Sequence, residues 1–311
     1  MRLPTPPRRL LAALAILTLF AAAPLRAETL RPVRVAEGIH ALVGEKGQRS
    51  PTNLGNNATF GVIVTADGVV LVDPGGSRAG AAAIDAAIAT LTDAPVKIVI
   101  DTGGQDHRWL GNGYWRQKGA RIVAAEAAVA DQRARAADQI AGAKQLLGDA
   151  FAGTEPVFAD TTFASELTLE LGGVRILVRR VGPAHTAGDT IVWLADRGVV
   201  FTGDVVYVER LLGVGPQSNS KSWIEAFDAI AELGPRHVVP GHGGPTDPAR
   251  ARAETRAYLV HLRREVEALL ARGGTLVDAP KIDQSAFSGL EQFDSLAARN
   301  ASQVFIEMEM D

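Results

Sequence analysis

Five polar motifs of this 311-residue sequence carry side chains that can bind a metal ion or transfer a proton, and each follows a short apolar run. Side chains at strand ends can be aimed into one shared cleft, because the sheet fixes the backbone there. Imidazole and carboxylate groups bind zinc and, with less preference, iron or manganese. The sequence has no cysteine, which excludes thiolate ligands and thiol nucleophiles. The residues concerned are Asp73, the pair Asp106 and His107, His185, Asp204 and His242.

The apolar runs around these motifs predict strands. Thr59–Val64 and Gly68–Asp73 flank a turn sequence and predict a β-hairpin, and Val96–Ile100 predicts a buried strand. A second hairpin is predicted from Leu167–Leu171 and Val174–Val181, which flank two glycines. Further strands are predicted at Arg121–Ala124, Thr190–Ala195, Val199–Thr202 and His237–Val239.

Helices are predicted between and after these strands from the 3.6-residue spacing of apolar side chains or from strong helix formers. They cover Gly80–Leu91, Trp109–Lys118, Glu126–Leu147, Trp223–Leu233 and Arg250–Arg272. The tail Asn300–Met310 fits either a helix or a strand. Two sheets packed together, with helices outside, would bury both sets of apolar faces. A doubly wound parallel sheet is the alternative, but it requires helices between nearly all strands.

Five segments, taken together and in this order, resemble the metallo-β-lactamase superfamily. They are V-L-V-D-P-G-G (Val70–Gly76), I-V-I-D-T-G-G-Q-D-H-R-W-L-G-N (Ile98–Asn112), G-P-A-H-T-A-G-D (Gly182–Asp189), F-T-G-D (Phe201–Asp204) and V-V-P-G-H-G (Val238–Gly243). The resemblance covers almost all of residues 28–311. It implies an α/β fold of the αββα four-layer sandwich type, followed by a C-terminal helical extension.

The resemblance implies two metal sites, of which the first is dismantled here. That site would use histidines at positions 103, 105 and 185, but this sequence has Gly103 and Gln105 and keeps only His185. His185 is still expected to be a metal ligand or to contact the substrate in catalysis.

The second metal site of the resembling family is complete. Its ligands would be Asp106, His107 and His242, and Asp204 matches the carboxylate that bridges the two metals. The resemblance therefore implies one bound ion, Zn²⁺, with iron or manganese as alternatives. Asp106 could bind that ion or take a proton as a general base.

The implied activity is hydrolysis of an ester, thioester or lactam-like acyl bond of a small-molecule substrate by a metal-activated water. The exported form and the C-terminal segment Asn300–Glu309 are similar to periplasmic metallo-hydrolases associated with quinoprotein or sulfur oxidation. This narrower resemblance implies a periplasmic redox-system partner. The alternative to an enzyme is a non-catalytic or weakly active accessory protein of such a system.

The first 27 residues predict a cleaved secretory signal peptide and a periplasmic location. Arg2, Arg8 and Arg9 precede the apolar run Leu10–Ala23, and Ala27 suits the cleavage point. The run is shorter than the about 20 residues that span a bilayer, so no stable membrane insertion is expected after cleavage. Cleavage would leave 28 basic against 35 acidic residues, a formal charge of −7. This charge argues against nucleic acid as a partner.

Overall fold

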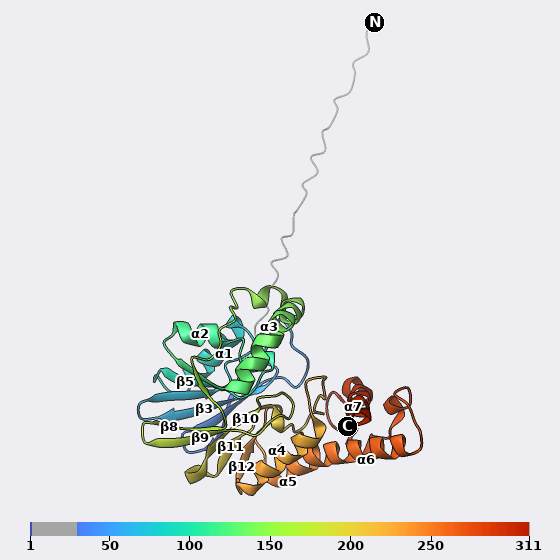
Figure 1. Cartoon of the computed structure of the whole chain (residues 1–311). Helices are drawn as coiled ribbons and strands as arrows, with labels where there is room; N and C mark the ends of the chain where they lie inside the picture. Colours follow the sequence, from blue (N-terminus) through green and yellow to red (C-terminus); the bar gives the residue numbers. More distant parts are fainter. Residues whose placement is uncertain (2–29, 311) are drawn as a thin grey trace.

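The computed structural model describes Met1 and residues 30–310. Apart from Met1, the signal peptide expected over residues 1–27 lies outside the described residues. Two β-sheets pack face to face, with helices on both outer faces (Figure 1). The predicted αββα sandwich is confirmed, and the doubly wound parallel sheet is excluded because both predicted hairpins form. Among the described residues, no helix is long and apolar enough to cross a membrane.

The first sheet has seven strands in sequence order. They are β1 (Pro32–Ala36), β2 (Ile39–Val43), β3 (Thr59–Thr65), β4 (Gly68–Val72), β5 (Val96–Asp101), β6 (Arg121–Ala125) and β7 (Thr161–Phe163). Strands β1 to β4 pair antiparallel, whereas β4 to β7 pair parallel. The carboxyl ends of β4, β5 and β6 therefore lie at one edge of the sheet.

The second sheet has five strands, in the spatial order β12-β11-β10-β9-β8. They are β8 (Glu166–Leu171), β9 (Val174–Arg180), β10 (Thr190–Leu194), β11 (Val199–Phe201) and β12 (His237–Val239). All pairs are antiparallel except β11 with β12. This parallel pair brings the residues after β11 and β12 to the same edge.

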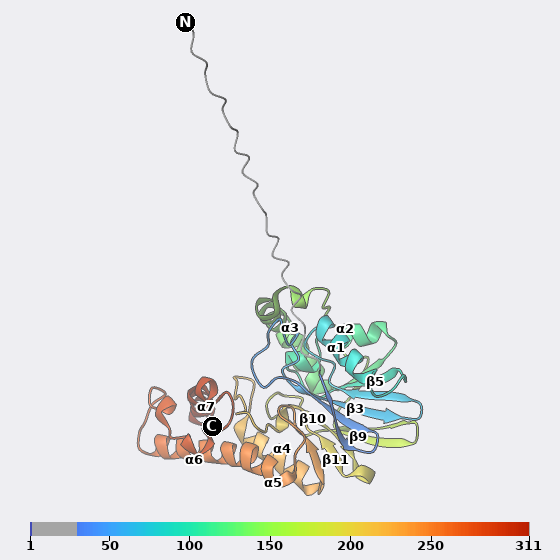
Figure 2. The ribbon, with the colours of Figure 1, turned by 180° about the vertical axis from the view of Figure 1, so that it is seen from behind.

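The apolar alternation along the strands explains the layers, because successive side chains point to opposite faces of a sheet. In β4, Val70 and Val72 join the core between the two sheets. Val69 and Leu71 join the core beneath the outer helices. That second core is covered by α1 (Arg78–Ile88) and α2 (Asn112–Gln117), with α3 (Glu126–Leu147) beside them (Figure 2).

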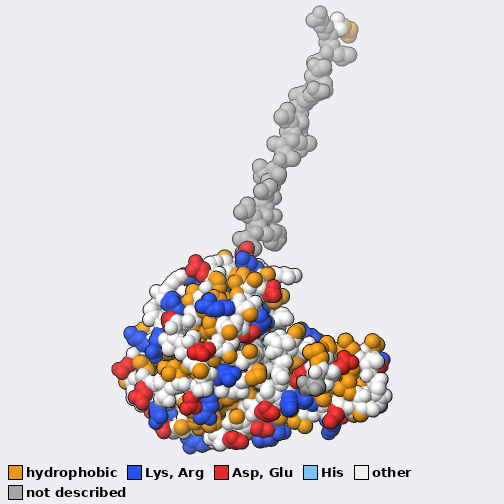
Figure 3. All heavy atoms as spheres, viewed as in Figure 1, with side chains coloured by type: hydrophobic (Ala, Val, Ile, Leu, Met, Phe, Trp, Pro, Cys, Tyr) orange, Lys and Arg blue, Asp and Glu red, His pale blue; other side chains and the backbone are white. Residues whose placement is uncertain are grey.

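The outer face of the second sheet is covered by α4 (Ser220–Glu232), α5 (Pro248–Ala251) and the first part of α6 (Ala257–Ala271), and α7 (Phe293–Glu309) packs against α6. The helix predicted at Arg250–Arg272 forms with a π-helical turn at Arg252–Arg256 between α5 and α6. The ambiguous tail is helical in α7. The end of α6 and α7 form a lobe beside the main body (Figures 1 and 3).

Asn300 of α7 fixes this lobe to the loop that follows β11. Its Oδ1 accepts a hydrogen bond from the Val214 amide at 2.8 Å, and its Nδ2 donates to the Leu212 carbonyl at 2.7 Å. Asn300 is fully buried. The side chains on α7 next to Asn300 therefore have a defined position relative to the residues around Gly213.

Candidate metal centre

Three predicted metal-ligating side chains converge at the shared edge of the two sheets. His107 lies in the 3-10 turn Asp106–Arg108 after β5, Asp204 lies in the turn Gly203–Val205 after β11, and His242 follows β12. Each offers a ligand atom within 4.8 Å of the others. The Asp204 carboxylate lies between the two rings, with Oδ2 3.2 Å from His107 Nε2 and Oδ1 3.1 Å from His242 Nε2. All three side chains are buried.

Arg108 holds the Asp204 carboxylate in place from the side of the protein core. Its Nε donates to Oδ2 at 3.2 Å and its Nη2 to Oδ1 at 2.7 Å. Nη1 donates to Asp73 Oδ2 at 2.7 Å and to the Thr59 carbonyl at 3.2 Å, and Nη2 also reaches the Gly241 carbonyl at 3.0 Å. Arg108 is completely buried, so it is a fixed cation between the two sheets.

Burial acts to raise the pKa of Asp204, but Arg108 and His107 outweigh it and hold that pKa well below its ordinary value. Asp204 is therefore ionised at neutral pH. Asp73 is not in the group of three; it accepts a hydrogen bond from the Thr102 amide at 2.8 Å as well as one from Arg108.

Asp106 contacts His107 rather than joining the group of three. Its Oδ1 lies 3.2 Å from His107 Nδ1, accepts a hydrogen bond from the His107 amide at 2.8 Å, and forms a salt bridge with Arg49. Burial acts to raise the pKa of Asp106, but Arg49 and His107 outweigh it and lower the pKa. The predicted role of Asp106 as a metal ligand or base stays a prediction.

His185 also lies outside the group of three, although it lines the same pocket as His107 and His242. Its Nδ1 lies 3.0 Å from the Gly213 carbonyl, which can only accept, so Nδ1 carries the hydrogen and Nε2 keeps a free electron pair. Burial lowers the pKa of His185 to about 4. This imidazole is therefore neutral at pH 7, and its predicted roles stay predictions.

The dismantled first site is filled by hydrogen-bonded protein groups. A Cβ on Gly103 would lie 2.8 Å from Asp189 Oδ1, which accepts from the Thr186 hydroxyl, while Oδ2 accepts from the Thr186 amide at 2.8 Å. Gln105 Oε1 lies 3.4 Å from Arg135 Nη1. Position 103 therefore has no side chain to offer a metal, and Gln105, which lines the same cavity as His185, offers an amide in contact with Arg135 in place of an imidazole.

The metal centre opens into a cavity of about 140 Å³. Its walls come from the loop before β3, from the segment after β11 and from α7. The lining residues are Gln48, Arg49, Asn57, Gln105, His107, His185, Tyr207, Arg210, Gly213, Val214, Gly215, Gln217, His242, Leu296 and Arg299.

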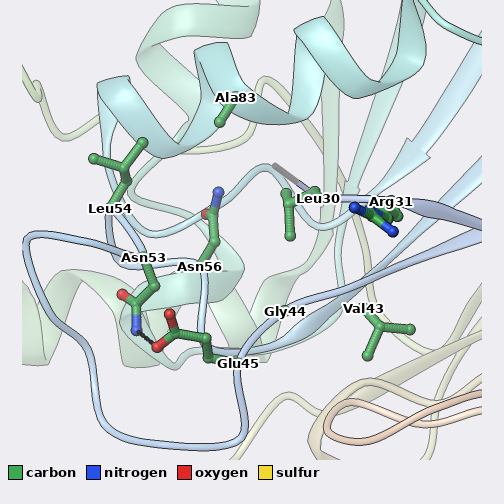
Figure 4. Close-up of a pocket in the computed structure, with 9 residues that line it drawn as sticks. All are labelled: Leu30, Arg31, Val43, Gly44, Glu45, Asn53, Leu54, Asn56 and Ala83. Carbon is green, nitrogen blue, oxygen red and sulfur yellow. Dashed lines mark hydrogen bonds between the residues drawn. The ribbon is translucent and has the colours of Figure 1, made fainter. Parts of the chain in front are cut away.

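A larger cavity of about 430 Å³ lies beside α1 and is lined by residues such as Leu30, Asn53 and Ala83 (Figure 4). Its one carboxylate, Glu45, accepts a hydrogen bond from Asn53 Nδ2 at 2.9 Å, and no histidine lines it among the described residues. The smaller cavity is the functional candidate, because it alone of the two contains imidazoles beside a buried carboxylate.

The donor set fits a zinc ion. His107 Nε2 is buried without a hydrogen-bond partner, although it lies near Asp204, and a buried polar atom of this kind is costly unless a ligand satisfies it. Burial and the adjacent Arg210 keep the pKa of His242 well below its ordinary value, so its ring is neutral as metal binding requires. Two imidazoles and one carboxylate match the three protein ligands of a catalytic zinc site.

Comparison with known proteins agrees with this geometry. A sequence model described as the metallo-beta-lactamase superfamily matches residues 55–242, and the chain belongs to that superfamily. Among curated proteins, none matches. All three predicted ligands of the group, His107, Asp204 and His242, lie within the matched residues.

Solved structures with the same fold include a metallo-beta-lactamase from Pontibacter korlensis, with a TM-score of 0.60 and 21% identity. That match covers 74% of this chain and 99% of the lactamase chain. The DIM-1 metallo-beta-lactamase exposed to ceftazidime gives a TM-score of 0.58 at 20% identity, covering 76% of this chain and 98% of that one. The inverting sec-alkylsulfatase Pisa1 from Pseudomonas sp. gives a TM-score of 0.70 at 15% identity. That match covers 89% of this chain and 50% of the sulfatase chain.

Four arginines at the site were not predicted from the sequence, and one of them, Arg299, reaches the cavity from α7. Arg108 is adjacent to His107, and its position directly after a motif of metal ligands is the one signal that could have indicated a buried ion pair. Arg49 and Arg210 come to the site from distant loops, and nothing in their local sequence indicates it.

Proposed function

We propose that this protein is a hydrolase that uses one divalent metal ion, held by His107, Asp204 and His242, to cleave an ester, thioester or lactam-like acyl bond. The convergence of two buried imidazoles with the ionised carboxylate of Asp204 beside a cavity carries this proposal. A metal held there would polarise the scissile carbonyl and lower the pKa of water toward about 7. One ion is proposed rather than two because Gly103 and Gln105 supply no imidazole.

Arg108 would hold the Asp204 carboxylate in one orientation, and Asp106 would orient the His107 ring through Nδ1. The lowered pKa of Asp106 makes its carboxylate a weak proton acceptor near pH 7. We therefore favour a ligand or positioning role for Asp106 over a general base. His185 Nε2 has a free electron pair and faces the same cavity, where it can accept a hydrogen bond from substrate or bind the metal.

The proposed periplasmic location is supported by the first 27 residues, in which a positively charged start is followed by an apolar run. The substrate is proposed to be a small molecule, since the cavity is about 140 Å³. A redox-system partner remains a proposal that the C-terminal resemblance supports.

The test is turnover of a 4-nitrophenyl ester, a thioester and a chromogenic cephalosporin by the purified full-length protein. We expect turnover of at least one substrate class, loss on chelation and recovery with added zinc. His242→Ala should abolish activity, whereas His261→Ala, which changes a half-buried histidine of α6 outside the cavity, should not.

One observation favours the alternative of an accessory protein. The Asp106 carboxylate, expected from the resemblance to bind metal, is paired with Arg49. If no acyl substrate gives chelator-sensitive turnover, the hydrolase proposal fails and the accessory role replaces it.

A further inference from the structure

Three arginines line the cavity above the metal centre. Arg49 comes from the loop between β2 and β3, Arg210 from the segment after β11, and Arg299 from α7. No Asp or Glu is among the residues that line this cavity. The chain as a whole is acidic, with a formal charge of −3, so a small cavity with three guanidinium groups is a local concentration of positive charge.

The guanidinium groups are incompletely neutralised. Among the described residues, Arg210 and Arg299 form no salt bridge, and Arg49 pairs with Asp106 alone. The Nε atoms of Arg49 and Arg210 are buried without a hydrogen-bond partner. Charged donors left unpaired in a partly buried site are costly, and a bound anion would offset that cost.

Two of these arginines lie outside the residues that define the family. The superfamily match covers residues 55–242, whereas Arg49 and Arg299 lie before and after it. The backbone at Arg299 has a fixed place because the adjacent Asn300 bonds to Val214 and Leu212 beside the cavity. The C-terminal lobe therefore adds a charged side chain, Arg299, that lies outside the residues matched by the family model.

Arg49 and Arg210 each lie beside one histidine of the metal centre, and metal binding would free a donor on each arginine for a ligand. Arg49 Nη2 lies 2.8 Å from His107 Nδ1, and Arg210 Nη1 lies 3.2 Å from His242 Nδ1. An arginine can only donate, so His242 Nδ1 accepts from Arg210, whereas His107 Nδ1, which also lies 3.2 Å from Asp106 Oδ1, accepts from Arg49 only in the tautomer that carries its hydrogen on Nε2. When Nε2 of either ring binds a metal, Nδ1 carries the hydrogen and cannot accept, so the arginine loses this partner and can donate to another acceptor.

We propose that this cavity binds an anionic group of the substrate, a carboxylate, sulfate or phosphate, through Arg49, Arg210 and Arg299; this inference rests on the proposed hydrolase function. The planar fork of a guanidinium donates two parallel hydrogen bonds to such oxyanions. The cavity lies directly against His107 and His242, so the anionic group would fix the acyl bond beside the metal centre.

Two experiments test the inference on the full-length protein. The first is calorimetric titration with sulfate, phosphate or acetate, each before and after chelator treatment, which separates binding by arginine from binding by metal. We expect saturable binding of at least one anion in both samples. Arg299→Gln should weaken it about 5-fold, since an exposed charged pair contributes at most about that factor. Arg272→Gln removes the same charge from an exposed position outside the cavity and should leave binding unchanged.

The second experiment compares 4-nitrophenyl acetate with the mono-4-nitrophenyl ester of succinate, which carries a free carboxylate. We expect a higher kcat/KM for the anionic ester, and a smaller preference in Arg299→Gln but not in Arg272→Gln. Equal turnover of the two esters, or anion binding that Arg299→Gln leaves unchanged, overturns the inference while the hydrolase proposal stands. Arginine-dependent anion binding with no turnover of any acyl substrate overturns the hydrolase proposal and, with it, the assignment of the anion to a substrate.

Discussion

The Arg108 guanidinium and the Asp204 carboxylate form a buried two-point salt bridge, with Nε to Oδ2 at 3.2 Å and Nη2 to Oδ1 at 2.7 Å. Asp204 is also the residue that lies between the two imidazoles of the metal centre. Arg108 of the core thus sets the orientation of the Asp204 carboxylate in the metal centre. The stability of the fold and the binding of metal are therefore coupled at this pair.

Arg108→Met should destabilise the fold by about 3–5 kcal/mol, because it leaves the carboxylates of Asp204 and Asp73 buried without their cation. Urea unfolding monitored by circular dichroism measures the change. Arg116→Met is the matched control, since the exposed Arg116–Asp160 pair should contribute less than about 1 kcal/mol. Equal effects of the two substitutions would show that Arg108 has no special structural role.

Asp106→Asn should lower metal affinity about 10- to 100-fold, the range typical for groups that orient or support metal ligands. The low pKa of Asp106 argues against a role as a base, so the pH profile of any activity should keep its shape. Competition with a zinc-binding dye measures the affinity. Unchanged affinity together with a large fall in kcat would instead identify Asp106 as a proton acceptor.

Gly103→Ala should destabilise the protein by about 1–3 kcal/mol, because the added Cβ would lie 2.8 Å from Asp189 Oδ1 in a packed region. For the same reason, replacing Gly103 and Gln105 together by histidine should not restore a second metal site. Gly142→Ala in α3 is the control, since nothing lies within 4 Å of its added Cβ, and it should stabilise by about 0.5–1 kcal/mol. A stable double-histidine variant that binds a second zinc ion would contradict this account of the first site.

The buried carboxyl of Asp189 should make the fold less stable as pH rises from about 4 to above 7. Burial raises the pKa of Asp189 from 3.8 to about 7, although hydrogen bonds from Thr186 oppose the shift. The folded protein then binds more protons than the unfolded chain in this range. The contribution of Asp189 to the free energy of unfolding is therefore fully present below pH 3.8 and is lost as pH rises through 7. At about 1.4 kcal/mol per pKa unit, the loss is at most about 4 kcal/mol.

Asp189→Asn removes the titrating group and should flatten this part of the curve of unfolding free energy against pH. Unfolding in urea at a series of pH values between 4 and 8 provides the measurement. An identical slope in the wild type and the variant would assign the pH dependence to other groups.

The sequence predicted most of the sandwich because alternation along its strands is strong. Val69–Val72 alternates between two cores, and α3 has the predicted bounds Glu126–Leu147. Strands β1, β2 and β7 were missed. In β7 (Thr161–Phe163) only Phe163 is buried, so the strand has no apolar run to indicate it, and β1 is partly exposed at the sheet edge, where burial does not select apolar residues.

For the site, the sequence located His107, Asp204 and His242 because motif order is visible along the chain. It could not locate Arg49, Arg210 or Arg299, because these come together only through the folded positions of two loops and α7. Nor could it show that Asp189 and Thr186 fill the space beside Gly103, since this packing depends on a segment more than 80 residues away.

The metal content of the purified full-length protein after dialysis tests the central claim most directly. Elemental analysis should give close to one equivalent of zinc, or of iron or manganese, per chain in the wild type. His107→Ala and His242→Ala should both lose it, because each removes one of three converging ligands, while His261→Ala should retain it. Two tightly held equivalents, or no metal after incubation with zinc, would contradict a single metal centre at His107, Asp204 and His242.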